Sequence, residues 1–347
     1  MKKLFFFAIA ALGMTAACQK PDVQVEDSNE PVAIKFGVNA PSLTVTKTKA
    51  AVDDWAENDA ITIYGYKKGD VNTVLLDGVE GTITSAGNES SVKFATPLYY
   101  EGTTVYDFRA IYVGDATKGE LTKGATIAQT ITIDGDDDIM HAVTDFENDK
   151  ADPTLGDGET AINEARIYSA YAARRNVHPS LVFEHLLTRF AFKVTKGNSS
   201  EDALPVNVTN ISVKSQETGT LYIAGSQEGT FVPSGDVKTL AVKDFEEIEP
   251  DVAAKPAGEI MIFPVAGADK FVEITLELKA EGQDVKPMTV KLTPNMIDAE
   301  NTEFAAGKKY DVTFTVYGLE QIKVTAKLTE WVNGGDAAYD PDKYWEE

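Results

Sequence analysis

Cysteine is almost absent from this sequence, because Cys18 is the only one among 347 residues. A single cysteine cannot form a disulfide within the chain, and it cannot provide a cysteine cluster for zinc. Histidine is nearly as scarce, and the three present, His141, His178 and His185, do not have the spacing of zinc ligands on a helix. The sequence therefore predicts no metal site and no cofactor, and the fold has to be stabilised by a hydrophobic core.

Motifs for catalysis and for nucleic-acid binding are missing as well. The chain has no phosphate-binding Gly-Lys-Ser/Thr loop, no Gly-x-Ser-x-Gly elbow and no Gly-x-Gly-x-x-Gly fingerprint. His185 lies in an apolar run, which favours a hydrogen-bonded structural imidazole over a base or a ligand. The 55 acidic residues outnumber the 32 basic ones, and the net charge of −23 disfavours binding to a phosphate backbone. The sequence predicts a protein that is not an enzyme and has no nucleic-acid partner.

Long apolar runs are also lacking, except at the start of the chain. Lys2 and Lys3 precede an apolar stretch over residues 4–17, which has the length of the apolar part of an export signal. Small residues, Thr-Ala-Ala, stand directly before Cys18, as lipoprotein signal peptidase requires. The pattern predicts a lipoprotein signal peptide over residues 1–17 and a lipid on Cys18. The alternative is a plain secretory signal in which Cys18 has no role.

The remaining chain is long enough for two ordinary domains. Residues 18–31 have no apolar periodicity and predict a flexible tether. Short alternating runs bounded by turn residues then recur, at 33–38, 60–66, 104–113, 206–213, 219–224, 259–265 and 272–278, with a hairpin at 310–316 and 322–328. Residues 197–200 break this pattern. We expect an all-β chain, with an N-terminal β-sandwich domain over 32–199 and a C-terminal one over 200–347.

Two features of the sequence, an acidic stretch and a set of aromatic residues, each allow two interpretations. Residues 134–157 are acidic and rich in turn residues, which predicts a long surface excursion. Asp134 to Asp138 form either a calcium loop or a solvated loop, and the second is favoured because Ile139 stands where an EF-hand needs glycine. Aromatic residues are expected to fill the space between sheets, or else to stack on sugars. They are Tyr99, Tyr100, Tyr339, Tyr344 and Trp345.

Several segments, in their order along the chain, together resemble one family. They are Ile-Lys-Phe at 34–36 with Thr-Lys-Thr-Lys at 46–49, the run from Trp55 to Tyr66, and the stretches 183–192, 304–310 and 317–336. The set is similar to the fimbrillin family, the subunits of type V pili on Gram-negative anaerobes of the mouth and gut. The resemblance covers most of the chain that follows the signal.

The resemblance implies a lipoprotein on the cell outer membrane, held there by the lipid on Cys18, with two transthyretin-like β-sandwich domains in tandem. It also implies that a protease removes an N-terminal strand and that a strand of the next pilus subunit fills the groove. The partners would be other pilus subunits, with a host or glycan ligand for adhesion. The alternating run at 33–38 supplies a candidate edge strand with Ile34, Phe36 and Val38 on one face.

The sequence departs from the family pattern at the cleavage site. Members that are processed by an arginine-specific protease carry arginine there, but the first arginine of this chain is Arg109. Either cleavage follows Lys47 or Lys49, or the strand is retained. We expect a structural subunit of an adhesive type V pilus, assembled by strand exchange; the alternative is a surface glycan-binding lipoprotein of a nutrient-uptake system.

Overall fold

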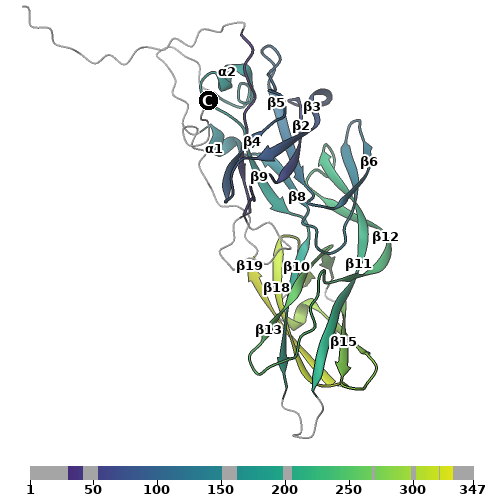
Figure 1. The fold of residues 1–347 in the computed structure, drawn as a ribbon. Helices are drawn as coiled ribbons and strands as arrows, with labels where there is room; N and C mark the ends of the chain where they lie inside the picture. The colour runs from purple at the N-terminus through teal and green to yellow at the C-terminus, as the bar shows by residue number, and fades with distance from the viewer. Residues whose placement is uncertain are drawn as a thin grey trace, which may run out of the picture.

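The computed structural model describes residues 30–41, 54–150, 162–197, 205–267, 270–297, 302–319 and 321–330. These residues are almost entirely β-structure and form two lobes stacked along the long axis of the molecule (Figure 1). The two short α-helices, α1 (Phe146–Asp149) and α2 (Ala170–Ala173), lie at the upper lobe. Neither is long enough to cross a bilayer, and no other helix in this part of the chain could do so. The predicted all-β class is confirmed.

The upper lobe is a closed barrel with the strand order β1-β4-β3-β2-β5-β8-β9. Its strands are β1 (Gly37–Asn39), β2 (Ala60–Lys67), β3 (Asp70–Ile83), β4 (Glu89–Lys93), β5 (Tyr106–Tyr112), β8 (Met140–Thr144) and β9 (Ser180–His185). All neighbouring strands are antiparallel except β1 and β9, which are parallel. Closure removes the free edges of the sheet, so each strand has a partner on both sides.

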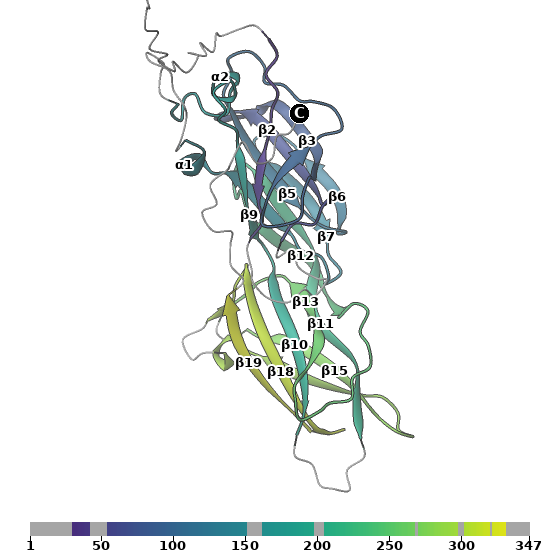
Figure 2. The same ribbon diagram turned by 60° about the vertical axis from the view of Figure 1, so that its left-hand side comes forward.

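The lower lobe is built from two larger sheets, and the end of the second sheet that contains β6 and β7 lies beside the barrel of the upper lobe (Figure 2). One contains β13 (Lys255–Ile262), β10 (Thr188–Lys196), β18 (Lys308–Gly318) and β19 (Gln321–Glu330), in that order. The other contains β16 (Lys286–Leu292), β15 (Val272–Ala280), β11 (Val206–Ala224), β7 (Ile127–Thr132) and β6 (Thr117–Thr122), with β12 (Phe231–Ala241) paired to β11. Short elements complete the lobe: β14 (Val265–Ala266), β17 (Glu303–Phe304) and the 3-10 turn Pro294–Met296. Buried side chains of both sheets form one apolar core.

A further apolar core joins the two lobes. The outer face of β2 carries Tyr64 and Tyr66 into this core, where they meet side chains of β7 and β11. The inner face of β2 carries Ile61 and Ile63 into the barrel. Strand β2 is therefore buried on both faces, because each face packs against a different core. The hairpin of β6 and β7 precedes β8 in the chain but pairs with the sheet of the lower lobe.

Two other expectations from the sequence are corrected. The runs at 206–213 and 219–224 are parts of one strand of 19 residues, β11, whose register with β12 shifts between Gln216 and Thr218. The stretch 134–157 is not a surface loop along its whole length, because β8 is a strand of the barrel wall, between β5 and β9. The predicted domain boundary near residue 199 lies outside the described residues. It remains a prediction, as does the transthyretin-like character of the domains.

The acidic stretch 134–138 is partly buried. Asp137 and Asp138 are 6% and 3% exposed, and the Asp138 carboxylate lies 2.9 Å from Nδ1 of His185. Asp137 accepts a hydrogen bond from the backbone N–H of Asp134, and burial raises the pKa of Asp137 to about 6. These two carboxylates are not part of a solvated loop. Within the described ranges, no group of three or more histidine, aspartate or glutamate side chains is arranged to hold a metal ion.

Candidate functional site

The N-terminal segment, defined here as residues 32–40, fills a slot in the wall of the barrel. Its strand β1 pairs antiparallel with β4, with Gly37 opposite Ser91, and parallel with β9, with Gly37 opposite Ser180. The sequence predicted an edge strand at this position. That expectation is wrong, because β1 has a hydrogen-bonded neighbour on each side.

Backbone hydrogen bonds hold the segment along most of its length. They join Ile34 N to Leu98 O (2.8 Å), Tyr100 N to Val32 O (3.0 Å), Val92 N to Phe36 O (3.1 Å), Gly37 N to Pro179 O (3.0 Å) and Ala40 N to Asn88 O (2.7 Å). Three separate parts of the barrel supply the partners, namely residues 88–92, 98–100 and 179. Removal of the segment would leave polar backbone groups unpaired on both walls of the slot.

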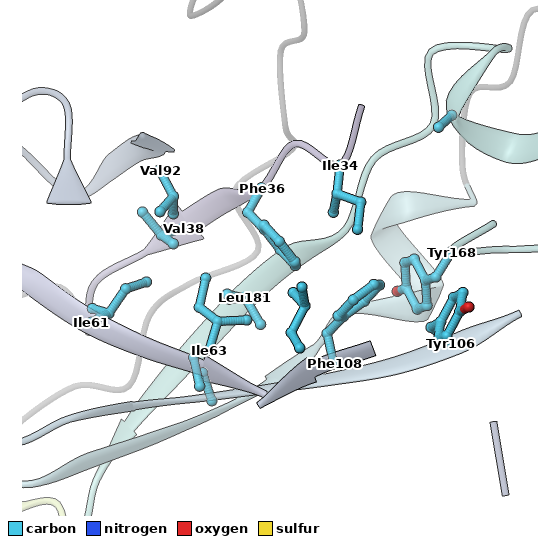
Figure 3. Close-up of a cluster of buried hydrophobic side chains, with 14 of the residues drawn as sticks. Ile34, Phe36, Val38, Ile61, Ile63, Val92, Tyr106, Phe108, Tyr168 and Leu181 are labelled. Atoms are coloured by element: carbon cyan, nitrogen blue, oxygen red, sulfur yellow. The ribbon is translucent and has the colours of Figure 1, made fainter. Parts of the chain in front are cut away.

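The side chains of the segment point into the barrel on the face that the alternation predicts. Ile34 is 4% exposed, and Phe36 and Val38 are fully buried. Figure 3 shows Val38 towards the end of the core that holds Val92, and Ile34 towards the opposite end. Burial of each of these three side chains contributes about 1.5–3 kcal/mol to the binding of the segment.

The centre of the slot is an aromatic pocket for Phe36. The Phe36 ring meets Phe108 edge to face, with 4.9 Å between ring centroids, and Phe94 at 5.9 Å. Phe108 lies on β5 opposite Gly65 of β2, and a Cβ atom at Gly65 would come within 2.8 Å of the Phe108 ring. Glycine at position 65 therefore leaves the room in which Phe108 can pack against Phe36.

A buried carboxylate lies near the start of β9. Oδ2 of Asp149 accepts hydrogen bonds from the backbone N–H of Ser180 at 2.9 Å and from the hydroxyl of Tyr168 at 2.8 Å. Oδ1 of Asp149 is buried and has no hydrogen-bond partner in the described part of the chain. Burial raises the pKa of Asp149 to about 7, although both hydrogen bonds favour the ionised form. Sequence patterns did not point to this site, because Asp149 stands in an acidic stretch typical of surfaces.

The other predicted site residues lie outside the described residues. This holds for Cys18, for the candidate cleavage positions Lys47 and Lys49, and for the aromatic residues at 339, 344 and 345. Lys47 and Lys49 belong to residues 42–53, the part of the chain that connects the N-terminal segment to Asp54. Of the two remaining aromatics, Tyr99 is 47% exposed, and Tyr100 is buried in the barrel core.

Comparison with known families decides which group of proteins this fold represents. The model of the fimbrillin-like family matches residues 48–331, which is most of the chain. The chain belongs to the fimbrillin-like family. The family consists of structural proteins of pili, so membership confirms that the chain is not an enzyme and supports a role as a pilus subunit at the cell surface. The N-terminal segment of this fimbrillin-like chain precedes the matched residues.

Solved structures are similar to this chain at low sequence identity. A candidate cell adhesion protein of Bacteroides uniformis is 18% identical, with a TM-score of 0.53 over 87% of this chain and 98% of that protein. A fimbrial protein of Bacteroides vulgatus is 13% identical, with a TM-score of 0.48 over 87% and 100% of the two chains. The fimbrial anchor protein Mfa2 of Porphyromonas gingivalis is 13% identical, with a TM-score of 0.38 over 88% and 100%. A search of curated protein sequences gave no match.

Proposed function

We propose that this fimbrillin-like chain is a structural subunit of an adhesive type V pilus that assembles by strand exchange at the slot of the N-terminal segment. One observation carries the proposal. The segment is paired on both sides and buries three apolar side chains, yet residues 42–53 are its sole covalent link to the rest of the barrel. A strand with these properties is an integral part of the core and can still be separated by one cut.

Cleavage after Lys47 or Lys49 would break that link. Departure of the segment would expose the backbone groups of β4 and β9 together with the pockets of Ile34, Phe36 and Val38. An extended strand from a neighbouring subunit would restore the hydrogen bonds of both walls and fill the pockets with alternate apolar side chains. The uncut chain has its slot filled by its own segment, so it should remain a monomer.

Cleavage would also separate most of the chain from the lipid on Cys18. In the uncut chain, the lipid, the tether over residues 18–31 and the N-terminal segment belong to one continuous polypeptide. Cleavage at Lys47 or Lys49 would leave the lipid on the removed piece and free the rest of the chain from the outer membrane. A chain that is never cut would stay anchored, as a pilus anchor or as a free surface protein.

Limited trypsin treatment of a non-lipidated Cys18→Ser form tests the proposal. We expect N-terminal sequencing of the product to begin at Thr48 or Ala50, followed by larger species in size-exclusion chromatography and fibres in electron micrographs. The Lys47→Gln/Lys49→Gln double variant is the control and should remain uncut in this region and monomeric. A cut wild-type chain that stays monomeric at high concentration would overturn the proposal.

The glycan-binding alternative has less support. Stacking on a sugar needs an exposed aromatic platform, and of the two described aromatics that were considered for this role, Tyr99 alone is exposed. Tyr100 packs near Tyr106 and Phe108 in the barrel core, with ring centroids 6.2 and 6.3 Å away. A single exposed tyrosine does not form such a platform.

A further inference from the structure

Strand β19 is the outermost strand of its sheet (Figure 2). In the part of the chain that the structure describes, β18 is its one hydrogen-bonded neighbour, and their register runs from Lys308–Glu330 to Val316–Ile322 without a shift. β19 contains no proline, whereas β16, the edge strand of the other large sheet, contains Pro287. A long, regular edge without proline is a template for pairing with a further strand.

The backbone groups of β19 that face away from β18 follow from the neighbouring ladder. Gly197 donates its N–H to the carbonyl of Val316 at 2.8 Å, so Val316 turns its backbone groups towards β10. Because successive residues of a strand point these groups to opposite neighbours, the odd-numbered residues 309–315 of β18 face β19. They pair with the odd-numbered residues 323–329 of β19. The even-numbered residues, from Ile322 to Leu328, therefore present their N–H and C=O groups to the free edge.

The core beneath β19 is incompletely covered. On β18, the inward side chains are at most 4% exposed, and they are Tyr310, Val312, Phe314 and Val316. The corresponding side chains of β19 are less buried. Leu328 is 42% exposed, and three others are half-buried against the same core, namely Ile322, Val324 and Ala326. An additional strand beside β19 would cover these apolar groups.

The sequence that follows β19 has the signal of a hairpin. Asn333 and Gly334 come three and four residues after Glu330, the last residue of the strand. Asn-Gly is the dipeptide preferred in the type I′ turn that joins two antiparallel strands. With these two residues as the turn, position 332 pairs with position 335, and the chain returns along the free edge of β19.

The side chains of the returning residues match both faces of β19. In this register, Leu328 lies opposite Tyr339, and Lys327 lies opposite Asp340. Residues directly opposite each other in antiparallel strands share a face, so the ring of Tyr339 would cover Leu328. Lys327 is exposed and has no acidic partner among the described residues. Asp340 would supply that partner.

The hydrogen bonds of the same register match as well. The residues that flank a two-residue turn form a hydrogen-bonded pair, and such pairs recur at every second residue. Starting from position 332, they fall on the even-numbered residues of β19, whose backbone groups are free. The ladder would end before Pro341, which lies opposite Ala326 and has no N–H to donate.

We propose that residues 335–340 of the same chain form a further strand along β19, joined to it by the turn at Asn333 and Gly334. The strand covers Leu328 and shortens the free edge to residues 321–326, where Lys323 disfavours pairing with another chain. It keeps two free subunits from joining through their β19 edges. The inference goes beyond the proposed function, because it concerns the lower lobe and not the slot of the N-terminal segment.

A cysteine pair tests the register in the uncut chain that carries Cys18→Ser. Lys327→Cys/Asp340→Cys places two thiols at a pair without hydrogen bonds, where Cα atoms approach to about 4.5 Å, within the range of a disulfide. The matched control is Lys327→Cys/Tyr339→Cys, whose thiols lie on opposite faces. With oxidised glutathione at low protein concentration, we expect the first pair to form a disulfide within one chain at least about 10-fold faster than the control. Mass spectrometry of the digested protein identifies the bond.

Two outcomes of this experiment would overturn the proposal. Equal rates for the two pairs would show that residues 335–340 do not lie in this register. Disulfides between two chains in place of one within the chain would show that the edge is covered by a second copy.

A substitution in the turn provides a second measurement in the uncut chain. Gly334→Val places a β-branched residue where the turn requires a positive φ, and it should speed amide exchange at Leu328 about 5- to 30-fold. Gly335→Val is the matched control, because position 335 lies in the proposed strand, where valine is favoured. Equal exchange in the two variants, or a Leu328 N–H that is unprotected in the wild type, would contradict the hairpin. Neither measurement involves the slot, so failure of the hairpin leaves strand exchange untouched, and failure of strand exchange leaves the hairpin untouched.

Discussion

Strands β1 and β10 occupy equivalent places in the two lobes. Each lies between one antiparallel and one parallel neighbour, β4 and β9 for β1, and β13 and β18 for β10. The N-terminal segment, which contains β1, and strand β10 also each present three alternate apolar side chains that are almost fully buried. They are Ile34, Phe36 and Val38 in the upper lobe and Phe190, Phe192 and Val194 in the lower lobe. By burial and pairing alone, both strands belong permanently to the core.

The two strands differ in how they are connected. β10 follows β9 after Leu186 and Leu187, and its parallel register with β18 extends over eight residue pairs. β1 has a parallel register of three pairs with β9, and residues 42–53 separate its segment from the rest of the barrel. If β1 is exchanged as proposed, then chain connection and ladder length, and not hydrophobicity, set it apart from β10.

Truncation of one buried ring in each lobe gives the largest expected effect. Phe36→Ala and Phe190→Ala should each lower the free energy of unfolding of the intact chain by about 3–5 kcal/mol, because each leaves a cavity in a close-packed core. After the N-terminal segment is cut and removed, Phe190→Ala should keep its cost, whereas Phe36→Ala should have none. Urea unfolding of both variants before and after the cut measures these changes in the free energy of unfolding. If Phe36→Ala still lowered the free energy of unfolding after the cut, the proposed difference between β1 and β10 would be wrong.

A buried ion pair is a second feature that anchors β10. Nε of Arg189 donates to Glu259 of β13 at 2.8 Å, and Nζ of Lys309 on β18 lies 3.4 Å from the same carboxylate. Arg189→Met should lower the free energy of unfolding by about 3 kcal/mol, because Glu259 would stay buried with a weaker partner. Lys193→Met is the control: its 3.9 Å pair with Asp311 is partly exposed, and its loss should cost less than about 1 kcal/mol. Equal costs for the two variants in thermal unfolding would contradict this view.

Gly65 gives a smaller test of the slot itself. Gly65→Ala should lower the free energy of unfolding by about 1–3 kcal/mol, because the added Cβ atom would displace Phe108 and disturb the pocket of Phe36. Hydrogen exchange should show faster opening at Gly37 than in wild type. Gly318→Ala is the control, since a Cβ atom there meets no atom within 4 Å. An undisturbed β1 in Gly65→Ala would show that Phe108 does not hold the segment.

The smallest change in the free energy of unfolding is expected for removal of the lipid anchor at Cys18. Cys18→Ser should abolish lipidation and shift the protein from the detergent phase to the aqueous phase, because no other apolar run outside the leader has the length of a membrane span. Its free energy of unfolding should change by less than about 0.5 kcal/mol, since Cys18 precedes both lobes. Phase partitioning and urea unfolding of the same preparations measure both quantities. Unchanged partitioning would rule out the lipid.

Local periodicity was enough to find many of the strands. The alternation of apolar and polar residues predicted β2, β13, β15 and the hairpin of β18 and β19. It also predicted that Ile34, Phe36 and Val38 share one face, which is buried. It did not find β8, because the acidic residues before it are typical of a loop and their burial depends on distant partners such as His185. The second neighbour of β1 also depends on a long-range contact, since Ser180 of β9 is far away in the sequence. Asp149 was missed for the same reason.

Strand exchange requires that the slot accept an extended strand from another chain once its own segment has been removed. The most direct measurement is fluorescence anisotropy of a labelled peptide of residues 30–41 added to the protein after cleavage within residues 42–53 and removal of the cut segment. We expect saturable binding that is lost when Phe36 of the peptide is replaced by aspartate, and no binding to the uncut chain. Equal binding of both peptides, or no binding to the cut chain, would contradict it.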